Sequence, residues 1–207
     1  MVRTTIILIV LHLGLKTIGQ SGYDSMNDKS KKNNFQSFTK EQIDFLVNEF
    51  TRELKNLPDD TNVNVSIGET ISLWNEGEKE YGPGIEFNSF FNPEFSGDFE
   101  RDNSNEIFFV VNKTGGGTAV WQVIYCLKTN KHSLRLTQLN ISCPCSNPFK
   151  CQDSPHPELT NINNDTLVIK TGCLNDKDAE CCPSIYYEVT YKYGNDSLIE
   201  LNKEKLE

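Results

Sequence analysis

The sequence predicts an α+β fold that is mainly antiparallel β, with one N-terminal amphipathic helix packed on a sheet of about five or six strands. Two observations lead to this prediction. Apolar residues recur at helical spacing between residues 40 and 56. Between residues 106 and 201, by contrast, apolar runs with strand-like alternation are separated by turn residues, as expected for a β core.

The N-terminus has the pattern of a secretory signal peptide, residues 1–19. Arg3 gives the basic start, Thr4–Leu15 is a short apolar run, and small residues precede the expected cleavage site. The alternative, a buried first strand, is disfavoured because the polar stretch 20–37 could not pack against it. We expect that stretch to be a disordered arm. Residues 38–207 then form a single secreted domain, in which no segment is apolar enough for a membrane span.

The predicted helix covers residues 40–56. Thr39 and Gln42 have the spacing of a capping box, which favours a helix start at this point. The apolar face of the helix is expected to consist of Ile43, Leu46, Phe50, Leu54 and Leu57. Such a face is typical of a helix that packs against a core.

The net charge of −9 is concentrated in one region. Between residues 58 and 100 there are ten acidic residues and one basic residue, Lys79, which argues against nucleic acid or an anionic membrane as a partner. We expect residues 74–99 to form a long acidic loop. Its phenylalanines either line a ligand cleft or cover the sheet edge, and they are Phe87, Phe90, Phe91 and Phe95.

From the end of this loop onward, every second residue has an oxygen-bearing side chain: Asp98, Glu100, Asp102, Ser104 and Glu106. A tight turn with this alternation can direct several oxygens to one Ca²⁺ ion, so these residues are the candidate ligands of a calcium site. Asn103 stands where such loops need a left-handed residue, a conformation that Asn tolerates. The alternative is a plain polar turn.

The predicted β core begins with two apolar runs, Ile107–Val111 and Ala119–Leu127, joined by a glycine-rich turn. Both faces of the second run are apolar, which indicates a central strand covered on both sides. Further strands are expected at residues 134–141, 166–171, 185–193 and 198–201.

All seven cysteines lie at or beyond residue 126, and their number favours an oxidising compartment. Those expected in loops, and therefore in disulfides, are Cys143, Cys145, Cys151, Cys173, Cys181 and Cys182. Cys126 lies on an apolar strand and is predicted to be the free thiol. The spacing of Cys143 and Cys145 is not that of a common zinc site, which disfavours the alternative of a thiolate-bound metal.

Candidate glycosylation sites follow from the Asn-x-Ser/Thr pattern, provided that the host attaches glycans to exported proteins. They are Asn64, Asn112, Asn140, Asn164 and Asn195.

Three motifs in order resemble a family of exported, β-rich bacterial proteins, over residues 96–193. These are Gly97-Asp98-Phe99-Glu100-Arg101-Asp102, then Gly115-Gly116-Gly117-Thr118, then Asp178-Ala179-Glu180-Cys181-Cys182-Pro183-Ser184. The resemblance implies a secreted β-rich fold and no particular activity. The first motif also resembles the calcium loops of FG-GAP repeats. That resemblance implies ligand roles for the side chains of Asp98, Glu100, Asp102 and Glu106 and for the backbone carbonyl of Ser104, although Arg101 and Asn103 replace glycines of the pattern.

The sequence contains neither the G-x-S-x-G nor the H-E-x-x-H pattern of nucleophilic or zinc catalysis. The leading hypothesis is therefore a secreted, disulfide-stabilised, non-enzymatic protein that binds an unknown extracellular ligand through residues 74–99. The first alternative is an acidic extracellular or mineral-matrix structural protein that holds calcium. The second is a hydrolase that uses a pair of carboxylates.

Overall fold

The computed structural model describes residues 35–56, 62–75, 83–115, 120–131, 133–142, 157–175 and 183–206. All of them belong to one unit, Asn33–Glu207. The predicted signal peptide and most of the predicted arm lie outside the described residues. So do five of the cysteines, Cys143, Cys145, Cys151, Cys181 and Cys182.

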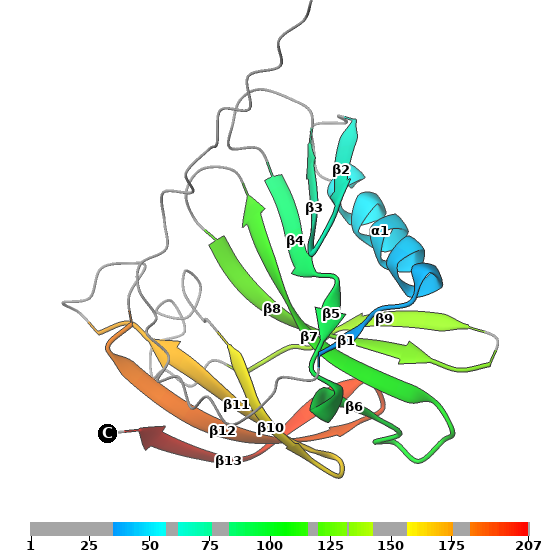
Figure 1. Cartoon of the computed structure of the whole chain (residues 1–207). Helices are drawn as coiled ribbons and strands as arrows, with labels where there is room; N and C mark the ends of the chain where they lie inside the picture. The colour runs from blue at the N-terminus through cyan, green and yellow to red at the C-terminus, as the bar shows by residue number, and fades with distance from the viewer. Residues whose placement is uncertain are drawn as a thin grey trace, which may run out of the picture. The chain divides into compact units, whose positions relative to one another are not determined.

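The described chain contains one α-helix and strands that pair in antiparallel fashion (Figure 1). In chain order the elements are β1 (Gln36–Ser37), α1 (Lys40–Lys55), β2 (Val63–Ile67), β3 (Thr70–Asn75), β4 (Pro83–Asn88), β5 (Phe90–Phe91), the 3-10 turn η1 (Pro93–Phe95), β6 (Ser96–Gly97), β7 (Asn105–Gly115), β8 (Val120–Thr129), β9 (Leu134–Gln138), β10 (Glu158–Asn163), β11 (Thr166–Cys173), β12 (Ile185–Gly194) and β13 (Ser197–Leu206).

The strands form a large sheet, a smaller sheet and a short pair. The large sheet has seven strands in the order β2-β3-β4-β7-β8-β9, with β6 also paired to β7. The smaller sheet has four strands in the order β10-β11-β12-β13, and β1 pairs with β5. Neighbouring strands in the large sheet are close in sequence, so most of its pairings are simple hairpins.

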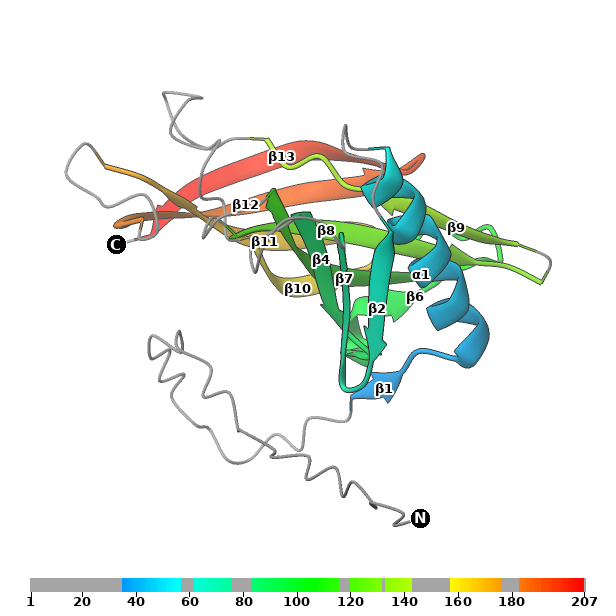
Figure 2. The same ribbon diagram turned by 90° about the horizontal axis from the view of Figure 1, so that it is seen from above.

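Strands β7 and β8 are buried on both faces and supply two separate cores. Ile107 and Phe109 point toward α1, whereas Phe108 and Ile124 point toward the four-stranded sheet. Successive side chains of a strand face opposite sides, so one hairpin can serve both layers. The result is three layers: α1, the large sheet and the four-stranded sheet. Both views show α1 beside β2 (Figure 1, Figure 2).

Helix α1 begins and packs as its sequence predicts. Thr39 and Gln42 form both hydrogen bonds of the capping box, and the helix continues to Lys55, one residue short of the predicted end. Phe50 is fully buried, with its ring centroid 5.3 Å from those of Phe87 and Tyr125. The described residues of the predicted apolar face therefore pack in the core, as expected, whereas Leu57 lies outside the described residues.

The prediction of a mainly antiparallel β fold with one N-terminal helix is confirmed. The prediction of a single sheet of about five or six strands is wrong, because the sheets are larger and more numerous. Residues 74–99 are not one loop, since they contain β4, β5 and β6. Strand β4 begins with Pro83-Gly84, a pair typical of turns, and its partner β7 is distant in sequence, so local patterns did not reveal it.

The end of the predicted disordered arm is also ordered. Gln36 and Ser37 form β1, which pairs with β5, and Phe38 donates its backbone N–H to the carbonyl of Ser89 over 3.1 Å. Among the described residues, no helix is both long and apolar enough to cross a bilayer.

Phe50 allows a direct test of the core under α1. The variant Phe50→Ala should lower the free energy of unfolding by about 3–5 kcal/mol, because it removes a fully buried ring and leaves a cavity. The control Ile67→Ala, at a side chain that is 60% exposed, should change it by less than about 0.5 kcal/mol. Urea unfolding followed by circular dichroism measures both. Equal losses in the two variants would contradict this assignment of the core.

Candidate functional site

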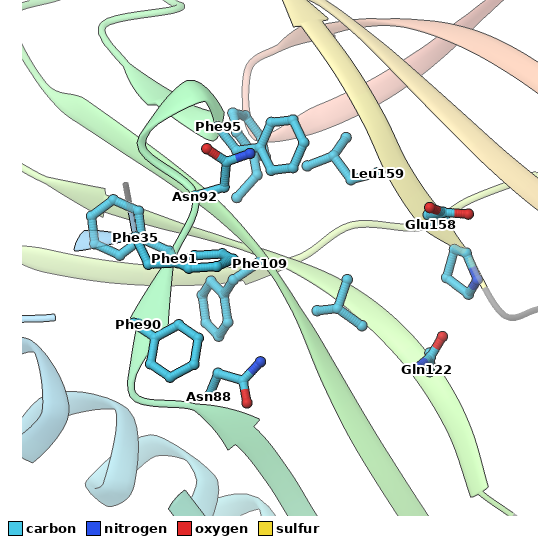
Figure 3. Close-up of a pocket in the computed structure, with 13 residues that line it drawn as sticks. Phe35, Asn88, Phe90, Phe91, Asn92, Phe95, Phe109, Gln122, Glu158 and Leu159 are labelled. Carbon is cyan, nitrogen blue, oxygen red and sulfur yellow. The ribbon is translucent and has the colours of Figure 1, made fainter. Parts of the chain in front are cut away.

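A pocket of about 350 Å³ opens beside β5 and η1, where β7 and β8 meet β10 (Figure 3). Its lining combines phenyl rings, a few aliphatic groups and several amides. The lining residues are Phe35, Asn88, Phe90, Phe91, Asn92, Phe95, Phe108, Phe109, Val110, Gln122, Pro157, Glu158 and Leu159. A concave, mostly apolar site with a few polar groups is typical of small-molecule binding sites.

The aromatic wall of the pocket is held by the β1–β5 pair. Phe35 and Phe90 approach each other with ring centroids 5.1 Å apart, and the ring of Phe91 lies 4.9 Å from that of the buried Phe38. Phe91 is therefore anchored in the core, while Phe35, 53% exposed, lies at the mouth. Contacts between such rings stabilise the arrangement beyond the effect of burial alone.

Two of the polar side chains that line the pocket, those of Asn92 and Gln122, are held by hydrogen bonds. The Asn92 side chain accepts the backbone N–H of Glu94 over 3.0 Å, and Gln122 Nε2 donates to Asn112 Oδ1 over 3.1 Å. Figure 3 shows Phe35, Phe90, Phe91 and Phe109 gathered on one side, with Gln122 and Glu158 on the other. Asn88 and Asn92 lie on the side of the phenylalanines and Leu159 lies near Glu158, so both sides of the pocket combine apolar and polar groups.

The structure assigns different roles to the phenylalanines of residues 74–99. Phe90, Phe91 and Phe95 line the pocket, whereas Phe87 is 2% exposed and belongs to the core under α1. Sequence reasoning missed Phe35, which lies in the predicted arm, and Glu158 and Leu159, which lie on an unpredicted strand. For Phe35 the available signal was its position three residues before the equally aromatic Phe38.

The second cluster of interest is the acidic turn between β6 and β7. One carboxylate oxygen from each of Asp98, Asp102 and Glu106 lies within 4.8 Å of the others. Asp98 accepts the backbone N–H groups of Asp102 and Asn103 at 3.0 and 3.1 Å. Asp102 accepts that of Ser104 at 2.9 Å. The carboxylates therefore organise the turn itself.

The backbone of this turn is left-handed at two residues. Arg101 has φ of 58° and Asn103 has φ of 64°. Asn103 fits the expectation that this position needs a left-handed residue. Of the remaining candidate ligands, Ser104 is buried and Glu100 contacts Lys128.

Lys128 lies on β8 and is the cross-strand partner of Glu106 on β7. Its ammonium group supplies a positive charge to this cluster from within the chain. Its Nζ lies 2.6 Å from Asp102 Oδ2 and 3.5 Å from Glu106 Oε1, and it also contacts Glu100. The hydrogen bond from Lys128 is the main cause that lowers the pKa of Asp102 to about 2. Hydrogen bonds to Asp102 and Glu100 outweigh burial and raise the pKa of Lys128. Burial raises the pKa of Glu106, whose side chain is fully covered.

The residues fit a calcium ion only in part. The oxygens are of the type that Ca²⁺ prefers, and Glu106 Oε1 is buried without a hydrogen-bond donor. Lys128, however, already places a positive charge against two of the three carboxylates. A calcium ion would have to displace that ammonium group.

The remaining predicted sites lie in varied surroundings. Cys126 is a buried free cysteine, as predicted, and its Sγ lies 3.4 Å from the hydroxyl of Tyr193. The prediction that Cys173 lies in a loop is wrong, because it is the last residue of β11, where it is buried and paired with Ile185 of β12. Asn164 and Asn195 are exposed in hairpin turns, and Asn140 is also exposed. Asn64 and Asn112 are half-buried on strands, which makes them less accessible glycan acceptors.

Replacement of Lys128 tests whether the acidic turn depends on its internal cation. Lys128→Met should lower the free energy of unfolding at pH 7 by about 3 kcal/mol, because buried Glu106 loses its nearest positive charge. The matched control is Lys40→Met. Lys40 pairs with Asp44 but is 88% exposed, so its loss should cost less than about 1 kcal/mol.

The pH dependence gives a second readout of the same variant. The pKa of Asp102 is about 2 in the folded protein, against 3.8 for an ordinary Asp. Its stabilising effect is therefore present above pH 3.8 and lost as the pH falls through 2. The difference in stability between wild type and Lys128→Met should narrow over this range. A difference that stays constant down to pH 2 would show that the ion pairs do not hold the turn.

Comparisons with known proteins do not place the chain in a family. No family model, no curated protein and no solved structure matches it. The resemblance to exported bacterial proteins stays a hypothesis, and function has to be argued from the pocket and the cluster themselves.

Proposed function

We propose that the protein is a non-enzymatic extracellular binding protein that takes a small ligand into the phenylalanine-lined pocket. The observation that carries this proposal is the cavity of about 350 Å³, lined by six phenylalanines and edged by amides. This volume lies at the lower end of the range of roughly 300–1,000 Å³ found for small-molecule sites.

The exposure of the aromatic wall supports a ligand rather than a purely structural role. Phe35 is 53% exposed although it lies against the ring of Phe90, so about half of its surface is in contact with water. A ligand with an apolar part would cover that surface, and the release of water from both would favour binding. The β1–β5 pairing holds the rings in place before a ligand arrives, which lowers the entropy cost of binding.

The composition of the lining favours binding over hydrolysis. Among the described residues that line the pocket, Glu158 is the one carboxylate, and a glycosidase-type mechanism needs two that face each other across the bond to be cleaved. The carboxylates that do lie close together, Asp98, Asp102 and Glu106, belong to the acidic turn and not to this lining.

The extracellular location rests on sequence and is part of the proposal. It is supported by the signal-peptide pattern of residues 1–19 and by the number of cysteines. The exposed hairpin positions of Asn164 and Asn195 suit glycan attachment in a host that glycosylates exported proteins.

Fluorescence of N-phenyl-1-naphthylamine, a neutral apolar dye that brightens away from water, tests the pocket. The folded wild type should bind the dye saturably. Phe90→Ala should weaken binding about tenfold, equivalent to about 1.4 kcal/mol, because one wall of the pocket is lost. The control Ile199→Ala removes a side chain that is 59% exposed on β13 and does not line the pocket, and it should bind as wild type does. Absence of saturable binding to the wild type would refute the proposal.

Calcium binding by an acidic structural protein is the second candidate function. The observation that favours it is the convergence of Asp98, Asp102 and Glu106, together with the buried Glu106 oxygen that lacks a hydrogen-bond donor. On this proposal calcium competes with the Lys128 ammonium for the same oxygens.

A thermal melt in calcium and then in excess EDTA tests this candidate. Calcium should raise the melting temperature of Lys128→Met more than that of wild type, because the competing charge is gone. A ligand present at 100 times its dissociation constant stabilises by about 2.7 kcal/mol. Addition of Asp98→Ala and Asp102→Ala should remove the effect. If neither protein responds to calcium, the cluster is a turn held by Lys128 and this candidate is wrong.

A further inference from the structure

The face of the large sheet opposite α1 carries an unbroken row of hydrogen-bonding side chains across five strands. Direct cross-strand partners place Ser66, Ser72, Glu86, Asn112 and Gln122 side by side, from β2 to β8. We call these five residues the polar row. Cross-strand partners share one face of a sheet, so all five side chains project in the same direction.

The polar row begins where the four-stranded sheet no longer covers the large sheet. Along β7 the residues on this face change from Phe108, which is 1% exposed, through Val110 in the pocket, to Asn112. Along β8 they change from the fully buried Ile124 to Gln122. Gln122 belongs to both the polar row and the pocket lining. The polar row therefore continues the pocket along the same sheet face.

An exposed tryptophan lies beside the polar row, on the side away from the pocket. Trp74 on β3 is 42% exposed and stands beside Gly84 of β4, which is paired with Thr114 of β7. A Cβ at Gly84 would lie 3.3 Å from Thr114 Cγ2 and 3.8 Å from Trp74 Cβ, so a side chain there would crowd this surface. Gly84 itself is buried, so its neighbours cover it, and the exposed part of this corner of the sheet face is the Trp74 side chain.

The chemistry of this surface matches a neutral, polyhydroxylated ligand. Amide and hydroxyl groups both donate and accept hydrogen bonds, as sugar hydroxyls do. Glu86 is the one charged residue in the polar row, so the row offers a strongly charged ligand a single ionic partner. In the amide pair Gln122 donates and Asn112 accepts, which leaves the Gln122 carbonyl and the Asn112 amino group outside that bond.

We propose that the polar row and Trp74 form a saccharide-binding face, and that the adjoining phenylalanine pocket takes an apolar group attached to the sugar. The indole face packs against the C–H face of the ring, while the polar row bonds the hydroxyls. The inference rests on the proposed binding function and specifies its ligand as a neutral glycoside, whether free or part of a larger glycan.

Titration calorimetry with phenyl glycosides of glucose, galactose, mannose and N-acetylglucosamine tests this inference. Phenol serves as the sugar-free control. The protein is produced in a bacterial periplasm, which forms disulfides but leaves Asn64 and Asn112 without glycans. At least one glycoside should bind more tightly than phenol. Trp74→Ala and Glu86→Ala should each weaken it about tenfold and leave dye binding in the pocket unchanged. Ile67→Ala, 60% exposed on the α1 side of β2, is the matched control and should bind as wild type does.

The outcomes separate the two proposals. Dye binding without glycoside binding overturns the saccharide inference and leaves the pocket function standing. Glycoside binding that survives Trp74→Ala also overturns it, because the sugar then lies elsewhere. Failure of both dye and glycosides refutes the proposed function together with this inference. If a glycoside does bind, competition by a soluble glycoprotein carrying the same sugar distinguishes a glycan ligand from a free glycoside.

Discussion

The burial of β7 and β8 on both faces is the constraint on which the rest of the structure depends. Alternate residues such as Phe109 and Phe108 enter different cores, one under α1 and one under the four-stranded sheet. Neither α1 nor the four-stranded sheet could bury its apolar face without this hairpin. The same alternation continues to Asn112 and Gln122, where the cover ends. The strands that build the core thus also carry the proposed binding surface.

The acidic turn shows how a strand register can decide the meaning of a sequence pattern. Alternating oxygens from Asp98 to Glu106 predict a cation site, and a cation does lie there, namely the ammonium of Lys128. That lysine faces the turn because Glu106 and Lys128 are cross-strand partners, and the pairing depends on the length of the β7–β8 hairpin. Spacing within the turn contains no information about a residue on the neighbouring strand. The local pattern predicted a calcium ion, which stays a prediction, and it gave no sign of Lys128.

The sequence predicted the elements that depend on local signals and missed those that depend on distant partners. Helix α1 has its capping box at Thr39 and its own apolar period, so its start and its buried face were predictable. The doubly apolar character of β8 identified it as a central strand. By contrast, β5 has two residues and is a strand only because β1 pairs with it. Strand β10, in a proline-rich region, likewise exists through its pairing with β11. Because β1, β5 and β10 were not predictable, the pocket could be suspected from Phe90 and Phe95 but not located.

The position of the pocket follows from incomplete coverage of one sheet by the other. The large sheet spans β2 to β9, whereas the four-stranded sheet packs against the residues of β7 and β8 near Phe108 and Cys126. Beside the start of β10 at Glu158, the apolar side chains of β7 would face water unless another group covered them. Phe35, Phe90 and Phe95 partly do so and leave a hollow between them. A surface of this kind combines a rigid sheet floor with an apolar wall that water solvates poorly. Both properties favour a bound ligand, since the floor needs no reordering and the wall gains from being covered.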